Sequence, residues 1–396
     1  MEEWSDTATR QCPVCHASTP QADFCGFCGA SLRVNPTFLR KLLRPKVYVA
    51  APRQPVGLPL ITSTLFPRLA QPYRRPFQHG LILIALGLVV FALLRLLVPL
   101  IVMTTLGLPL LFLLYLWQSD ARRTLPVKAM VTAAVVGFAV GAGWWLWASE
   151  EVARAYGVSL AAAFQLQYTI DAGFLINNGS VVMMAVPAVV VRLMRMRLHD
   201  SLDGFLIGAL GALFFFSAST LAWRIPQFTA GLLDNYGGGR LLEDTFLYAV
   251  ADPLTTVVIG GLVGSALWFK PRSPHLMRRV RPVLVLLTAA ALAVYYVEYY
   301  VDGAAFPRAA EEFCMVVLTA LALVLLRTGI QIALLHEAEK RSVPDTVRCG
   351  FCGKLVPGTA FCVECGGASR AAARWREPEP ADGYTHVYDG SKGVAT

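Results

Sequence analysis

The stretch "GFLIGALGALFFFSASTLAW" at residues 204–223 decides the class of fold. It holds no charged residue over 20 positions, about the length that an α-helix needs to cross the hydrocarbon core of a bilayer. The whole chain has the same character. Of its 396 residues, 56% are hydrophobic and 15% are charged, and its mean hydropathy is +0.53. Soluble globular proteins are seldom so apolar. We therefore predict an all-α polytopic membrane protein.

Eight apolar runs of this kind recur along the chain, and each predicts a membrane-spanning helix. They lie at about 80–97, 99–117, 128–148, 172–194, 204–223, 246–269, 282–301 and 312–334. The first two are expected to form a tight hairpin around Arg95 and Pro99. The first 32 residues are polar and rich in cysteine, so we do not expect the chain to open with a cleavable signal peptide.

The loops between these runs alternate in their content of Lys and Arg. The basic loops carry, in turn, Arg122, Arg123 and Lys128; Arg192, Arg195 and Arg197; and Lys270, Arg272, Arg278, Arg279 and Arg281. The intervening loops hold only Arg154, then Arg224 and Arg240, then Arg308. Because cytoplasmic loops are rich in positive residues, both termini are predicted to lie in the cytoplasm, with the helices in the plasma membrane of a bacterium. This topology accounts for most of the net charge of +9, so nucleic-acid binding is not needed to explain it.

A basic, proline-rich juxtamembrane linker occupies residues 33–78. Its prolines favour an extended chain. Two interpretations stay open: a flexible tether, or a segment over 33–75 that adheres to anionic lipids through Arg40, Lys41, Arg44 and Lys46. At the other end of the chain, residues 370–396 are predicted to form a disordered tail without chemistry.

Two stretches with the same cysteine spacing flank the apolar runs. "CPVCHASTPQADFCGFCG" begins at residue 12 and "CGFCGKLVPGTAFCVECG" at residue 349, and both contain CxxC, nine residues, and CxxC. This spacing is typical of a zinc ribbon, in which four thiolates wrap one tetrahedral Zn²⁺. The predicted ligands are Cys12, Cys15, Cys25 and Cys28 in a module at 1–32, and Cys349, Cys352, Cys362 and Cys365 in a module at 345–369. Gly29, Gly353 and Gly366 follow cysteines and are expected to turn the backbone there.

Redox CxxC pairs or disulfides are the alternative interpretation of these cysteines. A reducing cytoplasm argues against disulfides, and a redox motif seldom occurs twice at one spacing. Four protein ligands leave no open position for water, so we predict two structural zinc ions, one per module. Modules this small are expected to need the metal for folding, and to present a surface to a protein partner. The ninth cysteine, Cys314, is expected to be a buried small hydrophobe.

Two adjacent asparagines interrupt the apolar run at 172–194, in the stretch "FLINNGSVV" at 174–182. Amides at membrane depth need hydrogen-bond partners that lipid does not supply. Together with "DGFLIGALGALFFFSAST" from Asp203 and "ADPLTTVVIGG" from Ala251, this stretch resembles the membrane core of the PrsW family of intramembrane metalloproteases. The resemblance covers about residues 120–300.

Members of the PrsW family carry a paired-glutamate EExxK motif, then a DG that opens a glycine-spaced helix ending in Glu-Asn, and then a histidine followed by Thr and Gly. The positions that match this pattern are Asp203, Gly204, Gly208, Thr256 and Gly260. The positions that depart from it are Asn177 and Asn178 for the glutamates, Val181 for the basic residue, Ser219 and Thr220 for Glu-Asn, and Asp252 for the histidine. Where a further histidine is usual, the chain offers Tyr295, Tyr296 and Glu298.

These departures imply the loss of the family's chemistry. A metalloprotease needs zinc ligands and a carboxylate that takes a proton from the bound water, and a neutral amide is a poor ligand and no base. The resemblance therefore implies a non-catalytic pseudoprotease with no catalytic residues, whose asparagines hydrogen-bond between helices. A sharper alternative has Asn177, Asn178 and Asp252 forming a remodelled cation or ligand pocket.

Two other functions stay open. One is an active metalloprotease that uses displaced acids, namely Glu150, Glu151 or Glu298. Against it, "SEEVAR" at 149–154 lies beside the Trp144, Trp145 and Trp147 cluster, which is expected to form an aromatic belt, so this pair is predicted to be a solvated helix end. Glu298 is expected to face the outer interface. The other function is a transporter or ligand-binding bundle, which an inverted repeat would favour, and none is evident.

Overall fold

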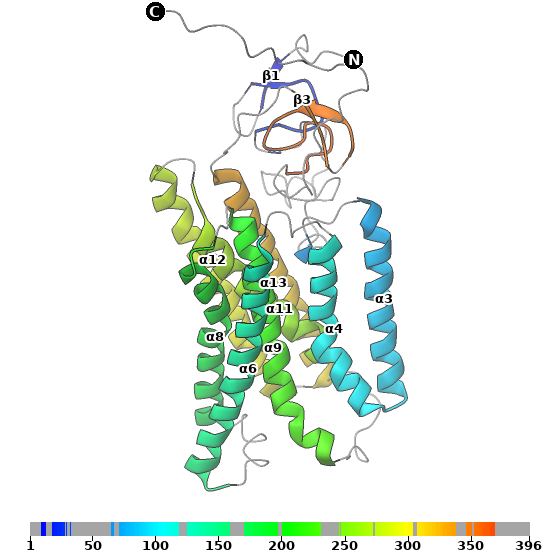
Figure 1. Cartoon of the computed structure of the whole chain (residues 1–396), viewed down its shortest axis with the longest axis vertical. Helices are drawn as coiled ribbons and strands as arrows, with labels where there is room; N and C mark the ends of the chain where they lie inside the picture. The colour runs from blue at the N-terminus through cyan, green and yellow to red at the C-terminus, as the bar shows by residue number, and fades with distance from the viewer. Residues whose placement is uncertain are drawn as a thin grey trace, which may run out of the picture.

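The computed structural model describes residues 9–12, 18–27, 29, 32, 65–66, 71–118, 125–158, 170–196, 200–230, 245, 247–271, 274–303, 307–337, 346–350 and 352–368. Over these ranges the chain is mostly helical. Long helices lie side by side in one bundle, and two small β modules lie together beyond one end of it (Figure 1). Most of the predicted linker, namely residues 33–64 and 67–70, and the predicted tail at 370–396 lie outside the described residues. Their predicted roles therefore stay predictions.

Eight α-helices lie within the described ranges: α3 Gln71–Leu93, α4 Leu97–Gln118, α6 Val127–Tyr156, α8 Ile170–Leu193, α9 Ser201–Ala230, α11 Asp252–Trp268, α12 Pro274–Gly303 and α13 Arg308–His336. A π-helix, η3 Leu247–Ala251, runs directly into α11. Six of the described segments are long and apolar enough to cross a membrane, while the apolar parts of α3 and α8 are shorter, at Phe77–Leu93 and Asn178–Leu193. The prediction of a helical multi-pass membrane protein is confirmed.

The turn between α3 and α4 confirms the predicted hairpin. Arg95 adopts a left-handed φ of 55°, and the amide of Leu96 donates to the carbonyl of Phe91 at 2.9 Å, which closes the end of α3. Pro99 falls in the first turn of α4, where its missing N–H costs no hydrogen bond.

Helix α9 is the centre of the bundle. It packs against α11, α6, α8 and α4, and 83% of its most apolar stretch is buried, compared with 22% for α6 and for α12. Figure 1 shows α9 surrounded by these neighbours. Outer helices instead expose large apolar side chains, as lipid contact requires.

Glycines bring α9 and α11 into backbone contact. A Cβ atom added to Gly208 of α9 would lie 2.0 Å from the carbonyl oxygen of Gly260, and one added to Gly264 of α11 would lie 2.0 Å from that of Gly204. No real Cβ tolerates such distances, so each of these positions accepts only glycine without movement of the backbone. This is the small-residue packing by which helices associate in lipid.

The contact between α6 and α9 follows the same rule. A Cβ on Gly137 of α6 would lie 2.3 Å from the carbonyl oxygen of Gly211, and one on Gly141 would lie 2.4 Å from that of Phe215. Two helices thus lie against α9 at backbone distance.

Polar contacts join α9 to two further helices. Pro109 lies inside α4 and lacks the N–H that would donate to the carbonyl of Thr105. The Ser217 hydroxyl of α9 donates to this carbonyl at 2.7 Å, so the acceptor is satisfied across the helix interface. At the start of α9, the backbone N–H of Ser201 donates to the Glu337 carboxylate, just beyond α13, at 2.5 Å. A carboxylate at a helix N-terminus is favourable because it meets unpaired amides and the positive end of the helix dipole.

The expectation that Cys314 is buried is wrong. Cys314 is exposed on the surface of α13 rather than buried, because that face of the helix points away from the bundle. The belt expected of the three tryptophans stays a prediction, and the ring centroids of Trp144 and Trp147 lie 5.2 Å apart. Trp147 is exposed, whereas the indole N–H of Trp144 donates to the Ser180 hydroxyl at 3.0 Å and its ring fills the space left by Gly179.

We expect Gly208→Val to lower the melting temperature of the detergent-solubilised protein by about 2–12 °C, because overpacking costs about 1–3 kcal/mol and each kcal/mol lowers the melting temperature of a large domain by about 2–4 °C. The matched control is Gly143→Val in α6, where an added Cβ would meet nothing within 4 Å. Differential scanning fluorimetry on both variants checks the packing. Equal melting temperatures for the two variants would contradict it.

Candidate functional site

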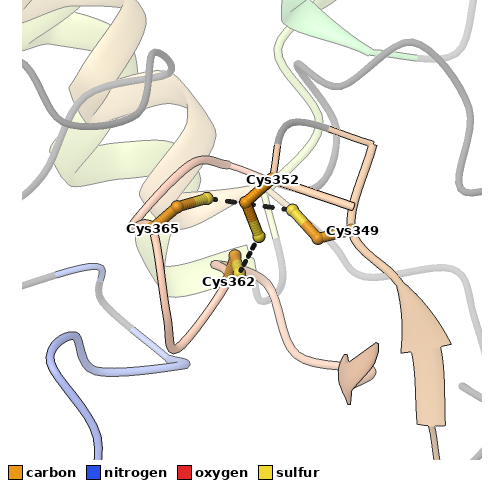
Figure 2. A group of neighbouring side chains, drawn as sticks. All are labelled: Cys349, Cys352, Cys362 and Cys365. Carbon is orange, nitrogen blue, oxygen red and sulfur yellow. Dashed lines mark hydrogen bonds between the residues drawn. The ribbon is translucent and has the colours of Figure 1, made fainter. Parts of the chain in front are cut away.

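The C-terminal module brings its four predicted ligands together. Strands β3 Thr346–Arg348 and β4 Leu355–Pro357 form an antiparallel hairpin with Val347 opposite Val356. Cys349 and Cys352 lie in its turn, and Cys362 and Cys365 lie in a second turn further on. The four sulfur atoms all lie within 4.8 Å of one another (Figure 2).

The sulfur geometry fits a tetrahedral zinc ion. The Sγ atoms of Cys349 and Cys365 are 3.8 Å apart, and those of Cys352 and Cys362 are 3.9 Å apart. Sulfurs at the corners of a tetrahedron with Zn–S bonds of about 2.3 Å are about 3.8 Å apart. These distances are too long for disulfide bonds, in which the sulfur atoms are about 2.0 Å apart. This module therefore has the donor set of a structural zinc site with no position left for water.

The four thiols are crowded, which makes them harder to ionise. Hydrogen bonding to the Cys349 thiol, together with burial, raises the pKa of Cys362 to about 12. Hydrogen bonds to Cys349 and Cys362 also raise the pKa of Cys365. Zinc binding at this site would therefore release protons from Cys362 and Cys365.

Glycines shape the knuckles as expected. Gly353 and Gly366 have φ values of 72°, and their amides donate to the carbonyls of Cys349 and Cys362, each at 2.8 Å. Gly29 has a φ of 68° and makes the same bond to Cys25. A residue with a Cβ would be strained in this left-handed conformation.

The N-terminal module repeats the hairpin. Strands β1 Thr9–Gln11 and β2 Ser18–Pro20 pair antiparallel, and Cys12 and Cys25 are fully buried beside Leu32. Cys15 and Cys28 lie outside the described residues. The second zinc site thus stays a prediction, based on the shared spacing and on two of its four cysteines.

The two modules bind each other through equivalent residues. Phe24 and Phe361 each directly precede the third cysteine of their module, and Gly26 and Val363 each directly follow it. The amide of Phe24 donates to the carbonyl of Val363, and the amide of Phe361 donates to the carbonyl of Gly26, both at 2.9 Å. Such reciprocal bonds are the mark of a two-fold interface, here formed within one chain. The sequence left open whether the modules meet; their identical spacing was the available signal.

Close packing of side chains against glycines also holds the two modules together. A Cβ on Gly26 would lie 2.7 Å from the Thr359 hydroxyl, and a Cβ on Gly366 would lie 2.7 Å from the Phe24 ring. Both glycines belong to a knuckle. The opposite ends of the chain therefore form a single unit beyond one end of the bundle (Figure 1), which we call the paired modules.

A second site lies inside the bundle, where the structure has a cavity of about 120 Å³. Five of the positions singled out by the resemblance line it: Ser219 and Thr220 of α9, Asp252 and Thr256 of α11, and Tyr295 of α12. Ile176 and Ser180 line it from α8, on either side of the asparagine pair. The cavity lies in the half of the bundle away from the paired modules. Helix α9 begins at Ser201, whose amide donates to Glu337, and Ser219 lies about five helical turns further along the helix.

The remaining positions of the resemblance lie elsewhere. Asn178 accepts a hydrogen bond from the Tyr296 hydroxyl of α12 at 2.5 Å, which is the interhelical partner that an amide at this depth requires. The side chain of Asn177 is outside the described residues. Gly204, Gly208 and Gly260 belong to the contact between α9 and α11. Asp203 is buried in the first turn of α9.

Glu298 is buried, so the expectation that it faces the outer interface is wrong. Only 3% of it is exposed. Its Oε1 atom accepts hydrogen bonds from Thr255 of α11 at 3.0 Å and from Thr319 of α13 at 3.3 Å. These two hydroxyls, distant in sequence, draw the carboxylate into the bundle.

Glu150 and Glu151 form the predicted solvated helix end. Their side chains are 56% and 39% exposed, and they bind Arg154 at 2.5 Å and 2.9 Å. Neither lines the cavity.

No protein-family model matches the chain, and no curated protein or solved structure matches it either.

Metal content tests the C-terminal site. We expect the purified full chain to carry two zinc ions and Cys362→Ser to carry at most one, since a three-cysteine set no longer closes the coordination sphere. Inductively coupled plasma mass spectrometry gives the count. Cys314→Ser, which changes an exposed cysteine outside both modules, is expected to keep the full zinc content. Unchanged zinc in Cys362→Ser would exclude the site.

Amide exchange tests the pairing. We expect Gly26→Val to raise the hydrogen–deuterium exchange rate at Phe361 by roughly tenfold or more, because the added side chain meets Thr359 and opens the interface. Lys354→Ala, which removes an exposed ion pair with Glu364 in the same module, is expected to leave that amide protected. Protection retained in Gly26→Val with zinc content unchanged would refute the pairing.

Proposed function

We propose that this multi-pass membrane protein is a non-catalytic, PrsW-like pseudoprotease whose paired modules form one cytoplasmic protein-interaction unit. The observation that carries the first part is the cavity. Positions that the resemblance assigns to a proteolytic centre, Ser219, Thr220 and Asp252, come from two helices and line one space in the bundle. An accidental match of sequence patterns gives no reason for them to meet.

The residues in this space support a loss of catalysis. Zinc hydrolysis needs three protein ligands around a metal that keeps an open position, and a base within reach of its water. Among the described residues, the cavity lining holds no histidine and no cysteine, and its carboxylates are those of Asp252 and Asp302. In the part of the chain that the structure describes, one group of Cys, His, Asp or Glu side chains lies close enough to share a metal ion. It consists of Cys349, Cys352, Cys362 and Cys365, and it lies outside the bundle.

The paired modules suit an interaction role. Their zinc sites are closed by four thiolates and offer no chemistry to a substrate. Phe27 and Leu355 expose apolar side chains on this unit, at 47% and 45%, which a protein partner would cover. The N-terminal and C-terminal modules lie on the same side of the bundle (Figure 1), which supports the proposal that both face the cytoplasm.

Replacement of all eight ribbon cysteines by serine separates the pseudoprotease from an active metalloprotease. We expect this variant to carry no stoichiometric metal in detergent, because the described residues of the bundle hold no group of side chains close enough to share a metal. Residual zinc near one ion per chain, lost on adding Asp252→Asn, would overturn the proposal in favour of a hydrolytic centre. Elemental analysis on a monodisperse fraction gives the result.

A further inference from the structure

The cavity in the bundle is acidic. Asp252 of α11 and Asp302 of α12 line it, and no lysine, arginine or histidine does among the described residues. Within those residues, Asp252 has no hydrogen-bond donor and no ion-pair partner. Glu298 and Asp302 are close enough for their charges to act on Asp252. Carboxylates inside a membrane bundle are costly and tend to mark binding sites.

Glu298 adds a second observation independent of the cavity lining. Only 3% of the Glu298 surface is exposed. The Oε2 atom of its carboxylate has no hydrogen-bond partner among the described residues. A buried acceptor without a partner carries a desolvation cost. Three acids thus gather in one region, and a cation in their midst would offset that cost.

Aromatic rings form much of the remaining wall. Trp145, Trp223, Tyr248, Tyr295 and Tyr299 line the cavity. The faces of indole and phenol rings attract organic cations, and such rings beside a carboxylate are suited to substituted ammonium groups. The chain itself uses these rings in this way: the Arg224 guanidinium lies 4.2 Å from the Trp223 ring centroid and 4.5 Å from that of Tyr248. Even with Arg224 counted, the acids outnumber the basic groups.

Size and donor set favour an organic cation over a metal ion. A cavity of about 120 Å³ takes a compact organic group, since an engineered cavity of about 150 Å³ in another protein binds benzene. Hard cations such as Ca²⁺ need about six or more oxygen ligands held close together. Asp252, Glu298 and Asp302 are not among the described groups close enough to share a metal.

We propose that this cavity is a binding site for a substituted ammonium group, with Asp252 as its counter-charge and the tryptophan and tyrosine rings as its walls. A lipid headgroup and a free amine share this chemistry. The ammonium site rests on the proposal that the bundle is non-catalytic, and it does not depend on the role of the paired modules.

Choline and its neutral isostere 3,3-dimethylbutan-1-ol provide the first test, on the full chain in phosphatidylglycerol nanodiscs. Trp145 and Trp223 line the cavity, so intrinsic fluorescence reports binding, with calorimetry as a second readout. We expect choline to bind at least about tenfold more tightly than the alcohol, because only choline carries the charge. Equal binding of the two, binding of neither, or displacement of choline by equimolar sodium would overturn the proposal.

Asp252→Asn is the matched variant, since it removes the charge and keeps the shape. We expect it to weaken choline binding by about tenfold or more. Glu150→Gln makes the same change on the exposed face of α6, outside the cavity, and is expected to leave affinity within about twofold of wild type. An equal effect of both variants, or none in Asp252→Asn, would refute the site. The comparison of choline with its isostere needs no variant, so it decides the matter if Asp252→Asn does not fold.

Nanodiscs of phosphatidylcholine distinguish the two sources of the ammonium group. Loss of free-choline binding there, with binding retained in phosphatidylglycerol, assigns the site to a lipid headgroup. Equal choline binding in both lipids assigns it to a free amine. Both results support the ammonium site, and absence of binding in both lipids would exclude it.

Discussion

The central helix α9 touches its two main neighbours backbone to backbone, at glycines spaced four residues apart. The pairs are Gly204 and Gly208 on α9, Gly260 and Gly264 on α11, and Gly137 and Gly141 on α6. Lipid tails are as apolar as leucine, so helices in a membrane gain little from burying apolar side chains against each other. Close approach and the dispersion contacts that come with it replace that driving force. The same approach fixes the rotation of α11 against α9, and with it the direction in which Asp252 and Thr256 point.

Rotation at this contact explains why one half of the bundle is sealed and the other is hollow. Near the paired modules, the glycines of α9 and α11 leave no space between the backbones. Further along α9, glycine gives way to phenylalanine, serine and threonine, and Ser219 and Thr220 line the cavity. The π-helix η3 runs directly into α11 at Asp252, on the same wall. Such bulges are frequent at functional sites because the altered turn redirects the residues that follow.

Sequence reasoning succeeded where the signal is local. The length and apolarity of the runs predicted the helices, Arg95 and Pro99 predicted the hairpin, and spacing alone predicted the Cys349 set. It failed where a side chain is placed by partners distant in the chain. Glu298 stands among tyrosines, which suggested an interface, but Thr255 and Thr319 from two other helices bury it. The sequence left the pairing of the modules open for another reason. Their identical cysteine spacing suggests similar folds, but the bonds that join them run between backbone groups of Phe24, Gly26, Phe361 and Val363, which leave no pattern of residue types.

The central claim is that contact between glycine backbones, and no metal, organises the membrane bundle, while metal is confined to the modules at its end. Anomalous diffraction at the zinc edge, measured on crystals of the full chain, locates every zinc ion directly. The account predicts zinc peaks surrounded by four sulfurs in the paired modules and none between α9 and α11. A peak beside Asp252, with side chains of the bundle as its ligands, would contradict it.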